Sequence, residues 1–98
     1  AAAPVRPSVE IDNDASKTDT VIDIVAGDRT GLLYDVAHTL SEMGIDFNAA
    51  HIVTDVGRAR DAFYVRMNDR KLEEPKLKEW VTQRLYEAIA GPSLLDKQ

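Results

Sequence analysis

The sequence predicts an α+β domain in which two helices cover one face of a four-stranded antiparallel sheet. Two segments carry apolar residues at helical spacing, and four segments are rich in residues that favour strands. Their order along the chain is strand, strand, helix, strand, strand, helix. Because each helix must bury its apolar stripe, both stripes need a sheet to cover. We therefore expect a two-layer sandwich.

Length and composition limit the possible functions. The chain has 98 residues, enough for one domain, and a net charge of -5. A negative chain does not favour a nucleic acid or an anionic membrane as its partner, since both attract clustered Lys and Arg. There is no cysteine, which excludes disulfides and thiolate metal sites. No apolar run approaches the ~18 residues of a membrane span, and we expect a cytoplasmic location.

The two ends of the sequence set the expected domain boundaries. Residues 1–7 combine alanine and proline without a long apolar core, so we interpret them as a linker or an expression remnant. Residues 8–91 contain every predicted element and are expected to form a single domain. Residues 92–98 show no strand pattern and are interpreted as a tail.

The first two strands are expected to form a hairpin. Residues 8–12 alternate apolar and polar side chains, and residues 13–17 are typical of a turn. Residues 18–26 carry apolar residues at adjacent positions around Asp23, which predicts a central strand.

The first helix is predicted to begin after Thr30, its expected N-cap, and to end at Gly44. Its expected apolar stripe is Leu32, Leu33, Val36, Leu40 and Met43. The residues expected on its outer face are Asp35, His38, Ser41 and Glu42.

The second half of the sequence predicts a hairpin and a second helix. Residues 45–55 are extended, residues 56–58 turn, and residues 59–67 return. One face of the first of these strands is expected to carry Ile45, Phe47, Ala49, His51 and Val53. Pro75 begins the last helix and Gly91 ends it. The apolar stripe of this helix is expected to be Leu77, Trp80, Val81, Leu85, Ala88 and Ile89.

The order of elements predicts a circularly permuted ferredoxin-like sandwich. A right-handed crossover through the first helix places the strands on its two sides parallel or one apart. A ferredoxin-like βαββαβ domain has the same content, but its last strand follows the second helix. Here an extra strand stands at the start, and residues 8–12 are expected to fill the edge left empty at the end.

With these elements placed, residues 20–89 resemble an ACT domain. That family joins its first strand to its first helix by an Asp-Arg-Pro-Gly-Leu-Leu type of motif, which here reads "DRTGLL" from Asp28 to Leu33. The stretches "SVEIDNDASKTDTVIDIVAGDRTGLLYDVAHTLSEMGI" and "AHIVTDVGRARDAFYV" are similar to the C-terminal ACT repeats of bacterial PII-protein uridylyltransferase/uridylyl-removing enzymes. The chain has one ACT unit and none of the catalytic machinery of these enzymes. The resemblance implies a regulatory module, not an enzyme, that binds a small amino acid such as glutamine.

The turn at residues 27–31 has the chemistry to bind such a ligand. The N–H groups of Gly31, Leu32 and Leu33 begin the helix without intrahelical partners and favour a carboxylate. Asp28 lies beside them and could receive an ammonium group. Gly31 is expected to let a ligand approach the backbone, and a valine there to block it without unfolding the domain. An ordinary turn that binds nothing is the alternative.

The resemblance implies a site formed by the turn and the start of the facing strand. The implied ligand-binding residues are Asp28, Arg29, Thr30, Gly31, Leu32, Asp46 and Asn48. No catalytic residue, metal ligand or cofactor is expected. His51 has no second histidine at ligand spacing, so we expect it packed or at an interface. Residues 12–14 lack the glycine and glutamate that complete a calcium loop.

The strand Ile45–Thr54 is expected at a sheet edge, where it can pair with a second chain. It has no Pro or Lys, and no charge from Phe47 to Val53, so nothing in it blocks pairing. Pairing with its own copy about a two-fold axis would share the ligand site between chains. A tandem ACT repeat covering this edge is the alternative. Three functions stay open: an amino-acid sensor, a structural dimerisation unit without a ligand, and, least favoured, a small enzyme.

Overall fold

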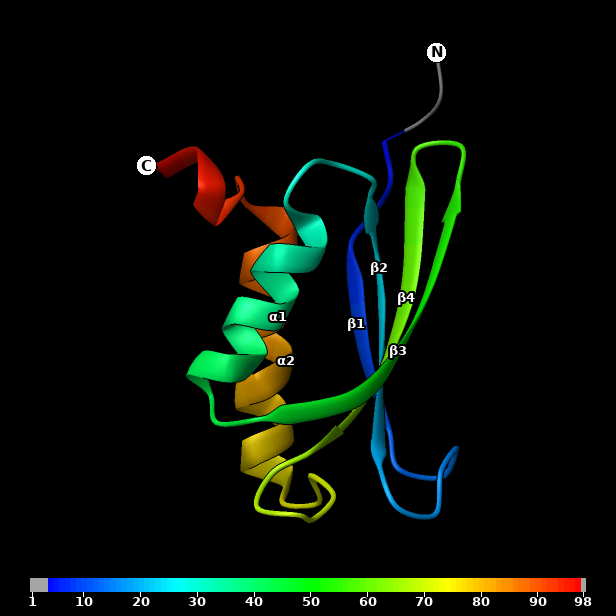
Figure 1. The fold of residues 1–98 in the computed structure, drawn as a ribbon, viewed down its shortest axis with the longest axis vertical. Helices are drawn as coiled ribbons and strands as arrows, with labels where there is room; N and C mark the ends of the chain where they lie inside the picture. The colour runs from blue at the N-terminus through cyan, green and yellow to red at the C-terminus, as the bar shows by residue number, and fades with distance from the viewer. Residues whose placement is uncertain (1–3, 98) are drawn as a thin grey trace.

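A computed structural model describes residues 4–97 and contains a four-stranded sheet in the order β1-β2-β4-β3. The elements follow the predicted order (Figure 1). Their bounds are β1 Ser8–Asp12, β2 Thr20–Gly27, α1 Leu32–Glu42, β3 Asp46–Asp55, β4 Arg58–Arg66, α2 Pro75–Ala90 and the short 3-10 helix η1 Leu94–Lys97. Every strand pair is antiparallel. The predicted ferredoxin-like α+β fold, with β1 at one edge and β3 at the other, is confirmed.

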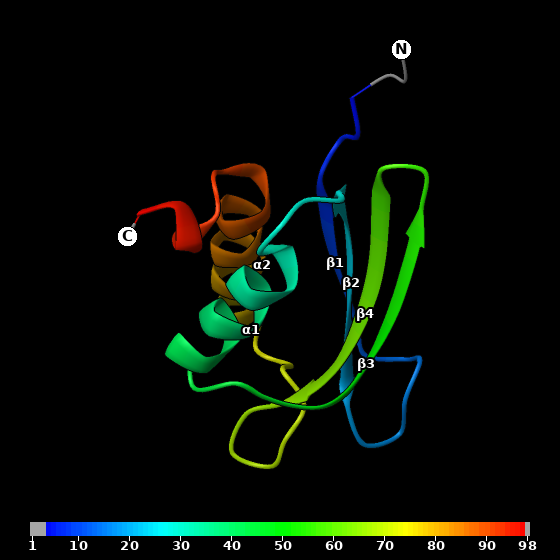
Figure 2. The same cartoon turned by 45° about the horizontal axis from the view of Figure 1, so that its top comes forward.

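Both helices cover the same face of the sheet, and the other face is open (Figures 1 and 2). The register pairs Ile22 with Phe63, and both side chains are completely buried. Residues that alternate with them along β2 and β4 point to the open face. The core lies between the sheet and the helices and includes Val36, Leu40 and Leu85. The sheet thus presents one packed face and one face free for other contacts.

A bulge in β3 changes which of its side chains face the helices. Phe47 pairs with Val65, but Ala49 pairs with the next residue of β4, Tyr64, so Asn48 is the extra residue. Phe47 lies on the helix face, where its ring meets Phe63 edge-on at 5.6 Å. The predicted common face of β3 is therefore wrong. Beyond the bulge, Ala50, Ile52 and Thr54 share the helix face, while Ala49, His51 and Val53 lie on the open face.

Several helix positions differ from the prediction. Gly31, not Thr30, is the N-cap of α1, and no side chain caps the helix. Asp35, expected on the outer face, is completely buried because an arginine and the C-terminal segment cover it. Leu33 and Trp80, expected in the core, are 47% and 43% exposed. Trp80 lies under the guanidinium of Arg84, 5.9 Å from the ring centroid, and so packs against a surface charge.

None of the helices within residues 4–97 is both long and apolar enough to cross a membrane. The predicted linker and tail extend beyond this range, and residues 1–3 and 98 lie outside the described residues.

Candidate functional site

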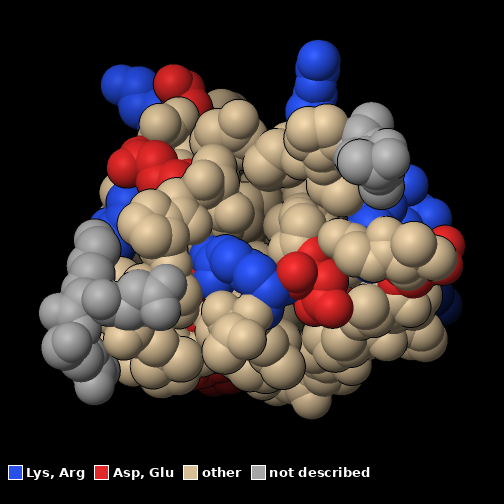
Figure 3. Space-filling view, turned by 90° about the horizontal axis from the view of Figure 1, so that it is seen from above, with Lys and Arg blue, Asp and Glu red and all other residues tan. Residues whose placement is uncertain are grey.

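The turn between β2 and α1 lies at the same end of the molecule as the β3–β4 hairpin turn. The Asp28 N–H donates a hydrogen bond of 2.8 Å to the Gly57 carbonyl. Gly31 has φ of 85°, a left-handed conformation that favours glycine. Figure 3 looks down on this end and shows basic and acidic side chains side by side on a surface that is otherwise largely uncharged. The turn therefore begins with a backbone hydrogen bond to the β3–β4 hairpin and ends at Gly31, whose left-handed conformation leads the chain into α1.

The start of α1 offers free backbone donors. The Leu32 N–H reaches the Arg29 carbonyl at 3.3 Å, and the Asp35 N–H reaches the Gly31 carbonyl at 2.9 Å. Within residues 4–97, no acceptor lies in hydrogen-bonding geometry to the N–H groups of Gly31 or Leu33. Such donors at the positive end of the helix dipole favour an anion. Of the three predicted donors, the N–H groups of Gly31 and Leu33 are thus available, and that of Leu32 makes one long hydrogen bond.

A cavity of about 300 Å³ lies between this turn and the edge of the sheet. The turn and α1 supply part of its lining, and β3 and β4 supply the rest. Its lining residues are Asp28, Arg29, Gly31, Leu32, Leu33, Tyr34, Ile52, Thr54, Ala59 and Asp61. Four predicted site residues therefore line one cavity.

Asp61 is the charged residue of this cavity that sequence reasoning missed. Its side chain is on the helix face of β4, only 4% of the residue is exposed, and Oδ1 has no hydrogen-bond partner among the described residues. Burial raises the pKa of Asp61, and the negative charge of Asp28 raises it further, while a backbone hydrogen bond from Val53 lowers it in part. The sequence did hold a signal: Asp61 falls between Ala59 and Phe63 in the two-residue alternation of buried positions.

Arg29 is committed to structural contacts. Its Nη1 lies 2.8 Å from Oδ2 of Asp35, an ionic contact without the geometry of a directed hydrogen bond. Its Nη2 donates to the Ala88 carbonyl at 3.0 Å. Oδ1 of Asp35 accepts bonds from the Ser93 hydroxyl at 3.1 Å and from the Leu94 N–H at 3.0 Å. The turn, the first turn of α1 and the C-terminal segment therefore share one buried carboxylate.

The space beside Gly31 is occupied by the C-terminal segment. A Cβ at Gly31 would clash with the Ser93 Oγ and would meet the Leu95 side chain at 3.2 Å. The expectation of open space for a ligand beside Gly31 is therefore wrong, and a valine there would clash with Ser93 and Leu95. The accessible side of the turn is the side that lines the cavity of about 300 Å³.

The two predicted residues on β3 lie at the far end of the sheet from the turn. The Asn48 amide donates to Oδ1 of Asp19 at 2.9 Å, and Asp19 precedes β2 whereas Asp28 follows it. Asp46 pairs with Arg66 at the same far end. A single chain therefore does not bring Asp46 and Asn48 to the cavity, and Thr30 does not line it either.

Within residues 4–97, histidines and acids do not gather into a metal site. Within the described part of the chain, no group of three or more His, Asp or Glu side chains is placed to hold an ion. His38 lies 3.6 Å from Glu42 and stacks on Tyr34. His51 is exposed on the open face of the sheet, so a partner and not the core would have to cover it.

Comparison with known proteins adds a family to this geometry. A family model described as ACR9-like, ACT-like domain matches residues 8–95. A bifunctional uridylyltransferase/uridylyl-removing enzyme of Azospirillum brasilense is 41% identical over 91 residues, which is 91% of this chain and 10% of that protein. The enzyme of the same name from Phenylobacterium zucineum is 40% identical over 91% of this chain and 10% of that protein. The one from Gluconobacter oxydans is 49% identical over 66% of this chain and 7% of that protein.

The chain thus spans about a tenth of the length of these relatives. No solved structure matches it. The family match covers all four strands and both helices. The chain is a small regulatory domain and not a catalytic one, and it belongs to the ACT-like domain family.

Proposed function

We propose that the chain is the amino-acid-sensing regulatory domain of a larger enzyme and that the ligand binds in the cavity beside the β2–α1 turn. One observation carries the proposal. The free N–H groups at the start of α1 and the buried carboxylate of Asp61 adjoin the same cavity of about 300 Å³. A free amino acid carries a carboxylate, which the N–H groups would bind, and an ammonium group, which Asp61 would bind.

The electrostatics of the cavity favour such a ligand. Asp61 and Asp28 place negative charge on one side, and burial makes the ionised form of Asp61 costly. An ammonium group would supply the missing partner of Oδ1. The volume lies at the lower end of the range for ligand pockets, which suits one small amino acid.

The relatives suggest what is regulated. They are named as bifunctional uridylyltransferase/uridylyl-removing enzymes. We infer that residues 8–91 form one regulatory unit of such an enzyme, in the cytoplasm, and that glutamine is the first ligand to test. The segment at residues 92–98 would then carry the signal away from the unit, because residues 93–95 contact the turn.

A dimer through β3 would complete the site. This strand is at the edge of the sheet and is exposed along its whole length. Antiparallel pairing of two copies places the start of one β3 beside the end of the other. Asp46 and Asn48 of the second copy would then approach the turn, from which they are remote in a single chain. A neighbouring ACT repeat on this edge is the alternative partner.

A purely structural role is the second candidate function. It is favoured by one observation: Arg29, the cation of the turn, already pairs with Asp35 and the end of α2. A dimerisation unit of this kind would show no affinity for amino acids.

Calorimetry with the twenty amino acids separates the two functions. We expect binding of one or a few of them, and at least about a tenfold loss of affinity in Asp61→Asn, since a charge-assisted contact contributes on the order of 1.5–3 kcal/mol. Asp23→Asn is the matched control, because Asp23 is an exposed aspartate on the open face of the sheet. Absence of heat with every amino acid would favour the structural role.

Sedimentation tests the β3 dimer separately. A lysine at Ala49, in the middle of β3, should weaken the dimer because edge lysines oppose strand pairing. Ser8→Lys, on the other edge strand, controls for the added charge. A wild-type chain that sediments as a monomer at all micromolar concentrations would contradict this interface.

A further inference from the structure

The cavity beside the β2–α1 turn carries an excess of negative charge. Its charged lining residues are Asp28, Arg29 and Asp61. The guanidinium of Arg29 lies 2.8 Å from the buried carboxylate of Asp35 and also donates to the Ala88 carbonyl. The positive charge of Arg29 is therefore already matched by Asp35. The two other acids remain without a matching cation.

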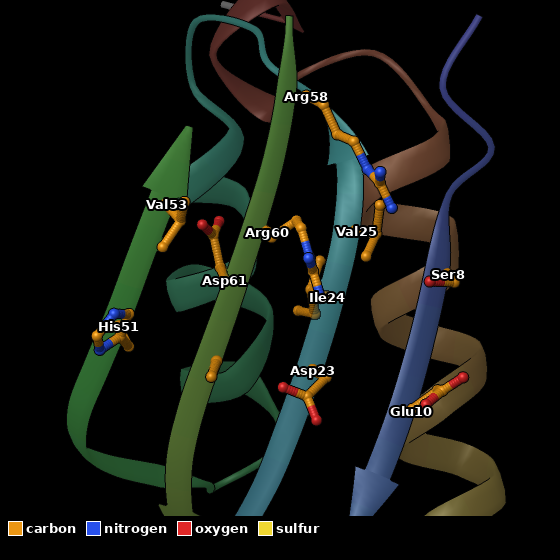
Figure 4. Close-up of a pocket in the computed structure, with 11 residues that line it drawn as sticks. Ser8, Glu10, Asp23, Ile24, Val25, His51, Val53, Arg58, Arg60 and Asp61 are labelled. Carbon is orange, nitrogen blue, oxygen red and sulfur yellow. The ribbon is translucent and has the colours of Figure 1, made fainter. Parts of the chain in front are cut away.

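Among the described residues, no cation pairs with these two aspartates. No ion pair of the described side chains includes Asp28 or Asp61. On β4, Arg58 and Arg60 extend toward β2, whereas the carboxylate of Asp61 points toward β3 and Val53 (Figure 4). The pKa of Asp61 is raised by burial, lowered in part by the Val53 backbone and raised further by Asp28, and no cation is among these causes.

The rest of the lining combines apolar surface with one unpartnered acceptor. Oδ1 of Asp61 has no hydrogen-bond partner among the described residues, although the residue is almost fully buried. A buried charged group without a partner is costly, so a positive group from outside would stabilise it. The apolar lining residues are Leu32, Leu33, Tyr34, Ile52 and Ala59. They offer contacts to an aliphatic stem between charged groups.

We propose that this cavity prefers amino acids of net positive charge, those with an aliphatic side chain that ends in an ammonium group. The inference rests on the proposed function, because it takes amino-acid binding at this cavity as given. The ligand carboxylate binds the free N–H groups of Gly31 and Leu33. The α-ammonium group binds Asp61, and the side-chain ammonium group meets the charge of Asp28, which is exposed.

The count of charges sets the order of affinity. An amino acid with a neutral side chain brings one positive and one negative charge, so it leaves one of the two aspartates unmatched. A positive side chain matches both aspartates, whereas a negative side chain adds like charge to the same space and is repelled. Lysine should therefore bind more tightly than norleucine, and glutamine more tightly than glutamate.

Calorimetry with these two matched pairs of ligands tests the preference. Lysine and norleucine have the same carbon chain and differ in the side-chain ammonium group. Glutamine and glutamate have nearly the same size and differ by one charge. At pH 7 and low ionic strength, the first member of each pair should bind about tenfold or more tightly than the second. Both ratios should shrink as salt rises.

A variant of the chain assigns the preference to the cavity. Asp28→Asn should bring the ratio of lysine to norleucine affinity down severalfold while norleucine binds nearly as before. Asp55→Asn is the matched control, because it makes the same change in net charge on the neighbouring β3–β4 hairpin, outside the cavity lining. Both aspartates are exposed, so both changes spare the core.

The outcomes separate this inference from the proposed function. If norleucine or glutamine binds and lysine binds no more tightly than norleucine, the charge preference is overturned and the proposed function stands. A preference for lysine that falls equally in Asp28→Asn and Asp55→Asn also overturns it, because the net charge of the chain would then be the cause. Absence of heat with all four amino acids and with the rest of the twenty would overturn the proposed function itself.

Discussion

Arg29 and Asp35 form an ion pair that joins the β2–α1 turn to α1, with Nη1 2.8 Å from Oδ2 and the carboxylate fully buried. The same carboxylate accepts two bonds from the segment after α2. A buried charge that loses its partner is costly, because water cannot replace it. The pair therefore holds together three segments that are far apart in the sequence.

Arg29→Ala should lower the free energy of unfolding by about 3 kcal/mol, since it leaves Asp35 charged and buried. Arg84→Ala is the control, because Arg84 meets the exposed Glu42 at 3.5 Å, and such pairs contribute less than about 1 kcal/mol. Urea unfolding measures both. If both variants lost the same free energy of unfolding, the Asp35 carboxylate would have to be solvated when Arg29 is absent.

Gly31→Ala should destabilise the domain by about 2 kcal/mol or more, through a positive φ and a clash with Ser93. Gly57→Ala isolates the cost of the positive φ, since Gly57 has φ of 75° and no atom lies within 4 Å of the new Cβ. Its expected cost is about 1 kcal/mol. Thermal unfolding of the two variants gives the difference, and no difference would place Ser93 away from Gly31 in solution.

The elements of the fold could be predicted because their signals are local. Spacing of apolar residues, Pro75 at a helix start and glycines at turns each act within a few residues. The faces of β3 could not be predicted, because the bulge at Asn48 depends on the register with β4. A shift of one residue moves every later side chain to the other face.

The site was predictable only in part, for a related reason. The turn residues that line the cavity could be proposed from the sequence because their chemistry is contained in one short stretch. Asp35 was misplaced because its partners, Arg29 and Ser93, come from outside its helix. Asp61 was missed because an acid on a strand is ordinary until the strand is known to bury that face.

Asp19 should contribute to stability only above acid pH. Its pKa is lowered, first by a hydrogen bond from the Thr18 hydroxyl; burial opposes this by a smaller amount, and Asn48 and Arg66 lower the pKa further. A carboxyl whose pKa is lower in the folded state stabilises the fold above its unfolded pKa near 3.8 and loses this as pH falls through the folded value.

The test compares Asp19→Asn with wild type across that range. The variant should unfold at lower urea concentration at pH 7, and the two midpoints should converge as pH falls below 3.8. Asp14→Asn, in the same exposed loop, is the control. A constant gap between wild type and Asp19→Asn at all pH values would assign the effect to packing and not to charge.

Asp61→Asn should change stability and ligand binding in opposite directions. The pKa of Asp61 is raised in the folded state, so the folded chain binds more protons than the unfolded chain between 3.8 and that raised value. The free energy of unfolding therefore falls as pH rises through this window, and the penalty is complete at neutral pH. Asparagine has the same shape and no charge, so it removes the penalty.

The ligand-free variant should be more stable than wild type at pH 7, equal to it near pH 3, and weaker in binding an amino acid. Urea midpoints at several pH values, with calorimetry on the same samples, measure the two effects. A variant that is both less stable and unchanged in binding would show that Asp61 serves the fold alone, as expected where a site does not give up stability for function.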